Sequence, residues 1–267
     1  MKSFTPVLAA SLALCLLAAQ PAFAANSGPR NTTHIFLPAI ASGDGDPTIG
    51  FVNGGLPANY SPSKEALAHI AQKTAVAERA WRDHLSNMSP QGVFYGVPTG
   101  YYQEPNLYAY RNYCGPSATQ VALSARLPSW QIPSIDTIGT EENIDPTWGV
   151  YMSAVVKVLN KRLNTTWYEV SVAGNFSTFS NHLTSDLTMR YAMVTGLQVT
   201  GLNGWGKSNA FHIVTVYNSY SPWGGASSLG YADTVSPAAG YNGNYDNVMD
   251  SYTFYTKYVS KNDVQAW

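Results

Sequence analysis

The chain has only two cysteines, Cys15 and Cys114, and this narrows the ways in which it can be stabilised. Cys15 lies within an N-terminal apolar segment that has the pattern of a removable leader. The mature chain therefore keeps one thiol, which has no partner for an internal disulfide. About 240 residues remain, enough for one sizeable hydrophobic core with a short appendage. The sequence thus predicts a domain held together by core packing and not by a disulfide framework.

The leader, residues 1–25, has the parts of a secretory signal peptide. A short positive start is followed by an almost unbroken apolar run from Pro6 to Ala19, and small residues stand at Ala22 and Ala24. The apolar run is too short to serve as a membrane anchor. We expect cleavage after residue 24 or 25 and a protein that is secreted.

Composition narrows the classes of partner. The net charge is −1 and only 12% of the residues are charged, so nothing indicates nucleic acid or an anionic surface as a partner. No second apolar stretch approaches the length of a membrane span. The sequence has no zinc-ligand spacing, phosphate loop or dinucleotide motif, so we expect neither a metal nor a cofactor. We expect a monomer.

Residues 26–91 form a predicted N-terminal extension. Residues 26–62 are rich in Asn, Gly, Pro and Ser, which is typical of turns. A helix is predicted from Ser63 to Leu85, because Ser63 can cap it and apolar residues recur at steps of three and four. Such a helix is either a propeptide or a packed part of the fold, and the sequence leaves both interpretations open.

Residues 92–267 are predicted to form the main domain. Helices are expected over Cys114–Ala125 and Tyr151–Leu163, with a shorter one carrying Phe176 to Leu187. Strands are expected over Val93–Tyr102, Trp167–Val172, Tyr191–Val199, Phe211–Tyr217, Leu229–Val235 and Tyr252–Val259. Helices followed by antiparallel strands predict an α+β domain.

The motif Asn-Tyr-Cys-Gly-Pro-Ser at residues 112–117 carries the strongest chemical signal. Gly115 and Pro116 allow a sharp turn into a helix, since proline is tolerated in the first helical turn. Cys114 then lies at the helix N-terminus, where the positive end of the helix dipole favours the thiolate. A lone thiol in an oxidising compartment is a liability, so a nucleophile is a better interpretation than an inert buried cysteine.

A thiolate nucleophile needs a partner that accepts and donates protons, and His212 is the best candidate. It stands at the front of a strongly β-branched strand, and imidazole titrates near neutral pH. The preceding loop is rich in glycine and could shape a substrate cleft with Trp205. The other histidines are found in poorer contexts: His34, His69, His84 and His182.

A third residue is expected to orient the imidazole. Asp233 is the leading choice, because two neighbouring antiparallel strands would bring it to the same end of the sheet as His212. Asn218 is the second choice and Asp246 the third. Gln103 can supply a side-chain donor to an oxyanion hole, together with the Cys114 backbone amide.

These residues, taken in order, resemble the papain-like cysteine peptidases. More narrowly, they resemble the bacterial branch related to peptidases that cut double-glycine leaders from bacteriocin precursors. The resemblance covers the chain from about Val93 to the C-terminus. It implies a papain-like fold in which a central helix carrying the nucleophile packs on an antiparallel sheet. It also implies a peptide or protein substrate, with Cys114 as nucleophile, His212 as base, Asp233 as the orienting residue and Gln103 in the oxyanion hole.

Two other functions stay open. An acyltransferase of the transglutaminase kind would use the same Cys-His-Asp residues, but an amine would replace water as acceptor of the acyl group. An exported binding module could keep the fold without activity, although the intact set of four candidate residues argues against it.

Overall fold

The computed structural model describes residues 54–57, 59–86, 92–205, 209–222 and 227–267. The predicted signal peptide and most of the turn-rich part of the extension lie outside these residues. The described part of the chain combines helices with an antiparallel sheet, which agrees with the α+β class predicted from the sequence.

One sheet of seven strands organises the described residues, and every recorded strand pair in it is antiparallel. The order is β2-β7-β3-β4-β5-β6, and β1 pairs with the second half of β4. The bounds are β1 Val93–Gly96, β2 Val170–Val172, β3 Met193–Gln198, β4 Phe211–Ser221, β5 Ser228–Ala232, β6 Asp246–Asp250 and β7 Val264–Ala266.

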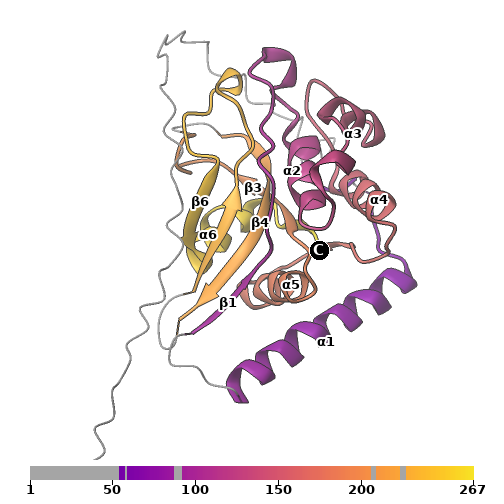
Figure 1. The fold of residues 1–267 in the computed structure, drawn as a ribbon, viewed down its shortest axis with the longest axis vertical. Coiled ribbons are helices and arrows are strands. Elements are labelled where there is room, and N and C mark those ends of the chain that lie inside the picture. The colour runs from indigo at the N-terminus through magenta and orange to yellow at the C-terminus, as the bar shows by residue number, and fades with distance from the viewer. Residues whose placement is uncertain (1–53, 58, 87–91, 206–208, 223–226) are drawn as a thin grey trace, which may run out of the picture. The chain divides into compact units, whose positions relative to one another are not determined.

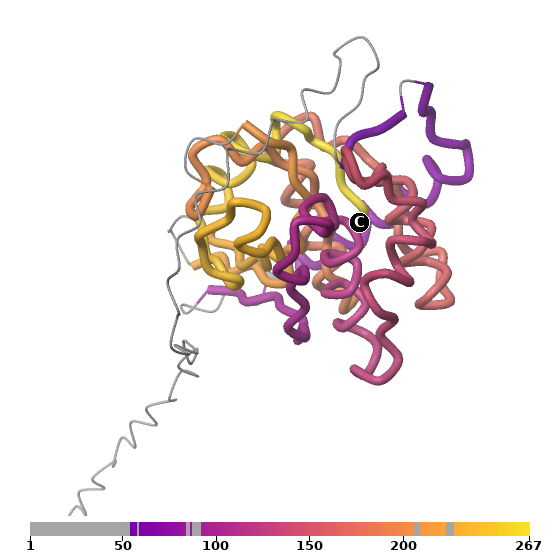
Figure 2. Tube along the Cα trace, turned by 90° about the horizontal axis from the view of Figure 1, so that it is seen from above, coloured from indigo at the N-terminus to yellow at the C-terminus, as the bar shows by residue number. Residues whose placement is uncertain are grey.

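α2, α3 and α4 lie on one side of this sheet, as Figure 1 shows, while α6 lies on the other side and packs against α5. Figure 2 gives the same separation from above. α2 packs against β4, α3 and α4, and α6 packs against β5 and β6. Their bounds are α1 Lys64–Ser86, α2 Cys114–Ser124, α3 Ile135–Glu141, α4 Met152–Leu163, α5 Phe176–Thr188 and α6 Ser251–Lys257.

The core lies between α2 and the central strands. The first ten residues of α2 are all buried, and so are the first five residues of β3. Small residues on α2, such as Ala118 and Ala122, allow the helix to approach the sheet closely. Thr215 Oγ1 on β4 donates a hydrogen bond of 2.8 Å to the Ala118 carbonyl, which fixes helix and strand at this point.

The N-terminal helix α1 is attached to the rest of the fold through a buried ion pair. Lys73 Nζ lies 3.3 Å from Asp186 Oδ1 on α5 and donates a 2.9 Å hydrogen bond to the Trp167 carbonyl. The same ammonium lies over the rings of Trp167 and Trp267, 4.3 and 4.4 Å from their centroids. Figure 1 shows α1 running beside α5, with the C-terminus close by. α1 is therefore in contact with elements distant from it in sequence.

Most predicted elements are present, with one element of the wrong type. The helix predicted from Ser63 is confirmed, and the Ser63 hydroxyl accepts a hydrogen bond from the Ala66 amide. The strand predicted over Tyr252–Val259 is wrong, because this segment forms α6 and a short 3-10 turn. The Asp250 side chain caps α6 by accepting from Thr253 N, and this cap overrides the strand preference of the aromatic residues.

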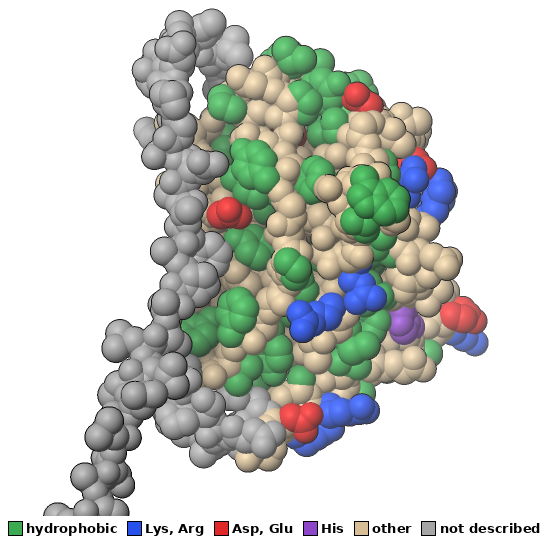
Figure 3. All heavy atoms as spheres, viewed as in Figure 1, with side chains coloured by type: hydrophobic (Ala, Val, Ile, Leu, Met, Phe, Trp, Pro, Cys, Tyr) green, Lys and Arg blue, Asp and Glu red, His purple; other side chains and the backbone are tan. Residues whose placement is uncertain are grey.

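The surface carries few charges. Figure 3 shows one face, where a few acidic and basic side chains, several of them side by side, lie among apolar and uncharged polar ones. Over the described residues, no helix combines the length and hydropathy that a transmembrane span needs.

Candidate active site

Cys114 is the first residue of α2 and is only 2% exposed. Backbone amides in the first turn of a helix have no acceptor within the helix, so they can donate hydrogen bonds to a negatively charged group placed there. Gly115 is required beside it, because a Cβ at that position would collide with Val150 Cγ1. The local sequence therefore fixes the thiol at a tightly packed helix start, as its Cys-Gly-Pro pattern predicts.

His212 and Asp233 meet at one end of the sheet. His212 is the second residue of β4, and Asp233 directly follows β5, which is antiparallel to β4. His212 Nε2 lies 2.9 Å from Asp233 Oδ1, and both side chains are buried. With Nε2 bonded to the carboxylate, Nδ1 is the ring nitrogen left to interact with Cys114.

The pKa of His212 depends on Cys114 as well as on Asp233. Burial by itself lowers the pKa of His212, since it disfavours the charged ring. The Asp233 carboxylate and the Cys114 sulfur oppose this effect by charge and by hydrogen bonding. Their combined influence raises the pKa of His212 above its ordinary value. The charged form of the imidazole is thus favoured by the Cys114 sulfur on one side and by the Asp233 carboxylate on the other.

Trp205 completes the surroundings of the pair. Its Nε1 donates a 2.9 Å hydrogen bond to Asp233 Oδ2, and its ring centroid lies 4.8 Å from that of His212. Asp233 thus accepts from Trp205 on one oxygen and from His212 on the other. The sequence indicated Trp205 only as part of a cleft wall, so its role in fixing Asp233 was missed.

The second and third choices for an orienting residue lie elsewhere. Asn218 is six residues beyond His212 on β4, about 20 Å along the strand. Its side chain packs beside Gly230. Asp246 begins β6 and accepts a 3.1 Å hydrogen bond from Tyr217 OH. Of the three candidates, Asp233 is the one hydrogen-bonded to His212.

Gln103 is exposed and engaged with its surroundings. Its Nε2 donates a 3.1 Å hydrogen bond to the Val235 carbonyl, and its Oε1 accepts one of 2.7 Å from Tyr101 OH. The Nε2 group has a second hydrogen that these contacts do not use. Its part in an oxyanion hole stays a prediction.

Glu104, next to Gln103, is a site residue that the sequence did not reveal. The side chain is 3% exposed, and burial raises its pKa to about 8. His212 and Asp233 both influence that pKa, in opposite directions. A second carboxyl group therefore lies within electrostatic reach of the histidine. In sequence, it looks like an ordinary surface glutamate after a strand.

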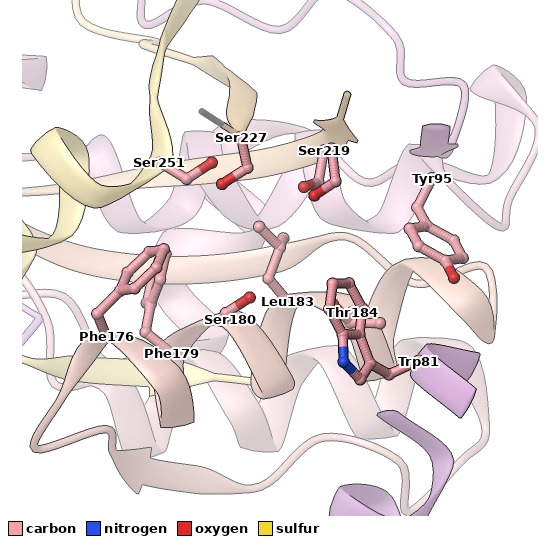
Figure 4. A pocket seen from close by; sticks show the side chains of 11 residues that line it. Trp81, Tyr95, Phe176, Phe179, Ser180, Leu183, Thr184, Ser219, Ser227 and Ser251 are labelled. Carbon is pink, nitrogen blue, oxygen red and sulfur yellow. The ribbon is translucent and has the colours of Figure 1, made fainter. Parts of the chain in front are cut away.

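The pocket drawn in Figure 4 is separate from this site. It lies between α1, α5 and the strand ends, with Trp81, Tyr95, Phe179 and Ser251 among its lining residues. Neither Cys114 nor His212 lines it. In the part of the chain that the structure describes, no cluster of three or more His, Cys, Asp or Glu side chains could hold a metal ion.

Comparisons with known proteins leave the family open. No protein-family model matches the chain, and no curated protein matches it. Among solved structures, the recombinant stem bromelain precursor is a distant neighbour, with 8% identity and a TM-score of 0.41. The match covers 78% of this chain and 93% of that one. At this distance, only the geometry of the site can carry a functional argument.

Proposed function

We propose that this protein is a secreted, papain-like cysteine peptidase that hydrolyses peptide or amide bonds. The observation that carries the proposal is the arrangement of Cys114, His212 and Asp233. A thiol at the start of a buried helix interacts with a histidine whose opposite nitrogen lies 2.9 Å from a buried carboxylate. A buried structural histidine needs hydrogen-bond partners, but it has no need of a sulfur at a helix N-terminus. Export is proposed from the signal pattern of residues 1–25 alone.

The residues divide the chemistry in the following way. The Cys114 thiolate attacks the substrate carbonyl carbon, and a C–S bond forms as the carbonyl oxygen takes up the negative charge. We assign the Cys114 backbone amide and the Gln103 side chain as the donors that stabilise that oxygen. His212 gives its proton to the leaving amine, and the C–N bond breaks to leave a thioester.

Water then completes the cycle. His212, now neutral, takes a proton from water, whose oxygen attacks the thioester carbonyl. The C–S bond breaks, the acid product leaves and the thiolate–imidazolium pair is restored. Throughout, Asp233 holds the ring and stabilises its positive charge, while Trp205 holds Asp233.

The test is hydrolysis by the secreted protein of fluorescein-labelled casein and of a mixed peptide library. Cys114→Ser and His212→Ala should each lower kcat/KM by about 10³-fold or more, because each removes a group that takes part in bond making. His69→Ala is the matched control, since His69 lies on α1 and contacts Glu169 instead of the site. Equal activity in wild type and both site variants would sink the proposal.

A second arm separates hydrolysis from acyl transfer. A fluorescent primary amine is added at increasing concentration, and labelled products are counted against hydrolysed ones. A peptidase yields acid products with little amine incorporation. Amine incorporation that dominates at low amine concentration would instead identify an acyltransferase.

A further inference from the structure

We propose that Glu104 is a positioning residue of this site, whose buried carboxyl group sets the charge that the His212 ring faces. The inference rests on the proposed function, because it assigns a role relative to the reacting pair. It goes beyond that function in adding a fourth ionisable group, one that acts through His212 and takes no direct part in bond making.

The placement of Glu104 is fixed by the segment that carries Asp233. The Glu104 amide donates a 2.8 Å hydrogen bond to the Thr234 carbonyl, one residue beyond Asp233. On either side, Gln103 Nε2 donates to the Val235 carbonyl and Ser236 Oγ donates to the Pro105 carbonyl. Residues 103–105 therefore run directly along residues 234–236, and the Glu104 side chain turns inward.

The carboxyl group of Glu104 is poorly satisfied. Both of its oxygens are buried, and within the described residues neither makes a hydrogen bond of good geometry. Burying an unpaired carboxylate is expensive, so the neutral acid is the form that this environment favours. Glu142 is also buried and also has an unpaired oxygen, so the feature that distinguishes Glu104 is its place beside the segment that carries Asp233.

Three groups govern its ionisation. Burial raises the pKa of Glu104, the positive His212 ring on β4 lowers it, and Asp233 after β5 raises it, with a net value of about 8. The Ser236 backbone amide also favours the charged form, although its geometry falls short of a hydrogen bond. Below that pH, Glu104 is neutral and adds no charge beside Asp233. Above it, a second carboxylate faces the His212 imidazolium.

This interaction must act in both directions. If positive His212 favours ionised Glu104, then ionised Glu104 favours positive His212 to the same extent. Since the pKa of His212 is raised, the ring loses its proton only after Glu104 has become charged. Glu104 thus holds the proton on His212 to higher pH and extends the range in which the ring can protonate a leaving amine.

Glu142 provides a matched control. It is 2% exposed, and burial raises its pKa to about 8 as well. Its neighbours differ: Thr119 donates a hydrogen bond to one of its oxygens, the Glu141 carboxylate raises its pKa, and its other oxygen lies toward Gly115 on α2. Glu104→Gln and Glu142→Gln are both isosteric and remove one buried acid, but only the first removes a charge facing His212.

The experiment follows His212 by NMR in full-length protein labelled with ¹⁵N-histidine, with its signal assigned by loss in His212→Ala. We expect the titration midpoint of His212 to fall by about 0.5 to 1 pH unit in Glu104→Gln and to stay unchanged in Glu142→Gln. The alkaline limb of kcat/KM should move to lower pH by the same amount, while the acid limb should not move. Wild-type protein alone should show a second, small inflection of the His212 signal near pH 8.

An unchanged His212 midpoint in folded Glu104→Gln, or an equal fall in Glu142→Gln, would overturn the proposal. If Glu104→Gln does not fold, the wild-type inflection decides, and its absence overturns the proposal. The NMR readout needs no turnover, so failure of the peptidase assay rejects the proposed function without deciding the coupling between Glu104 and His212.

Discussion

Removing the charge of Lys73 tests how much the contact between α1 and α5 contributes to the stability of the fold. Lys73 is 1% exposed and Asp186 is 0% exposed, so neither charge of the pair has access to water. Lys73→Met keeps most of the length of the side chain and removes the ammonium. Asp186 then retains the 2.8 Å hydrogen bond from Trp167 Nε1 and loses its cation.

The expected cost is large. Breaking a buried ion pair on one side costs about 3–5 kcal/mol. Burial already raises the pKa of Asp186, so the unpaired carboxylate can take up a proton and recover part of that cost. We therefore expect the free energy of unfolding to fall by about 3 kcal/mol, a sizeable part of the usual 5–15 kcal/mol.

Urea unfolding followed by circular dichroism measures this value. Lys64→Met, at the exposed start of the same helix, should change stability by less than about 0.5 kcal/mol. The double variant Lys73→Met with Asp186→Asn should recover most of the loss, because it removes both charges and keeps an acceptor for Trp167. Equal stability of the Lys73 and Lys64 variants would refute the reasoning, and so would a double variant no better than the single one.

The same contact predicts the outcome of trimming the chain. Protein that starts at Gln91 lacks α1 and therefore Lys73. Asp186 and the rings of Trp167 and Trp267 then lose their contacts with the Lys73 ammonium. We expect it to be less soluble and less stable than protein that starts at Asn26, which makes α1 a structural part of the domain. Trimmed protein that is soluble and more active would identify α1 as a propeptide.

Two further predictions concern the site. Asp233→Asn should leave a measurable remnant of activity, because Asp233 orients and stabilises the His212 ring and takes no part in bond making. Asn218→Ala should have nearly wild-type activity. The kcat/KM values of both variants test this, and the reverse pattern would contradict the assignment of Asp233. At neutral pH, Cys114 should react with iodoacetamide faster in the wild type than in His212→Ala, because the His212 cation stabilises the thiolate. Equal reaction rates in the two proteins would indicate an inert cysteine.

Local chemistry explains which site residues the sequence could reveal. Gly115 and Pro116 mark the start of a helix within three residues of Cys114, so the position of the thiol follows from short-range rules. His212 and Asp233 lie on neighbouring strands, and antiparallel pairing of consecutive strands is a strong expectation. Their meeting at one end of the sheet could therefore be predicted without the structure.

The remaining site residues depend on contacts between distant segments. Glu104 is buried because its segment runs along residues 234–236, and Trp205 reaches Asp233 from a loop. No periodicity encodes either contact. The same holds for β7, a three-residue strand at the end of the chain that is fixed by pairing with β2 and β3. Short strands of this kind carry too few residues for a pattern to be visible.

Two buried acid–base pairs in this fold differ in a way that separates structure from function. Lys73 is surrounded by acceptors and aromatic faces, and the contacts of its pair with Asp186 include no thiol, although Asp186 Oδ2 makes no hydrogen bond within the described residues. His212 also pairs with a buried aspartate, but its other side faces a sulfur, and an unsatisfied glutamate lies nearby. Ionisable groups left incompletely satisfied beside a nucleophile are typical of catalytic sites, where local stability is given up for reactivity. The difference between the two pairs favours His212 over any other buried charge in the described residues as the base of a thiol enzyme.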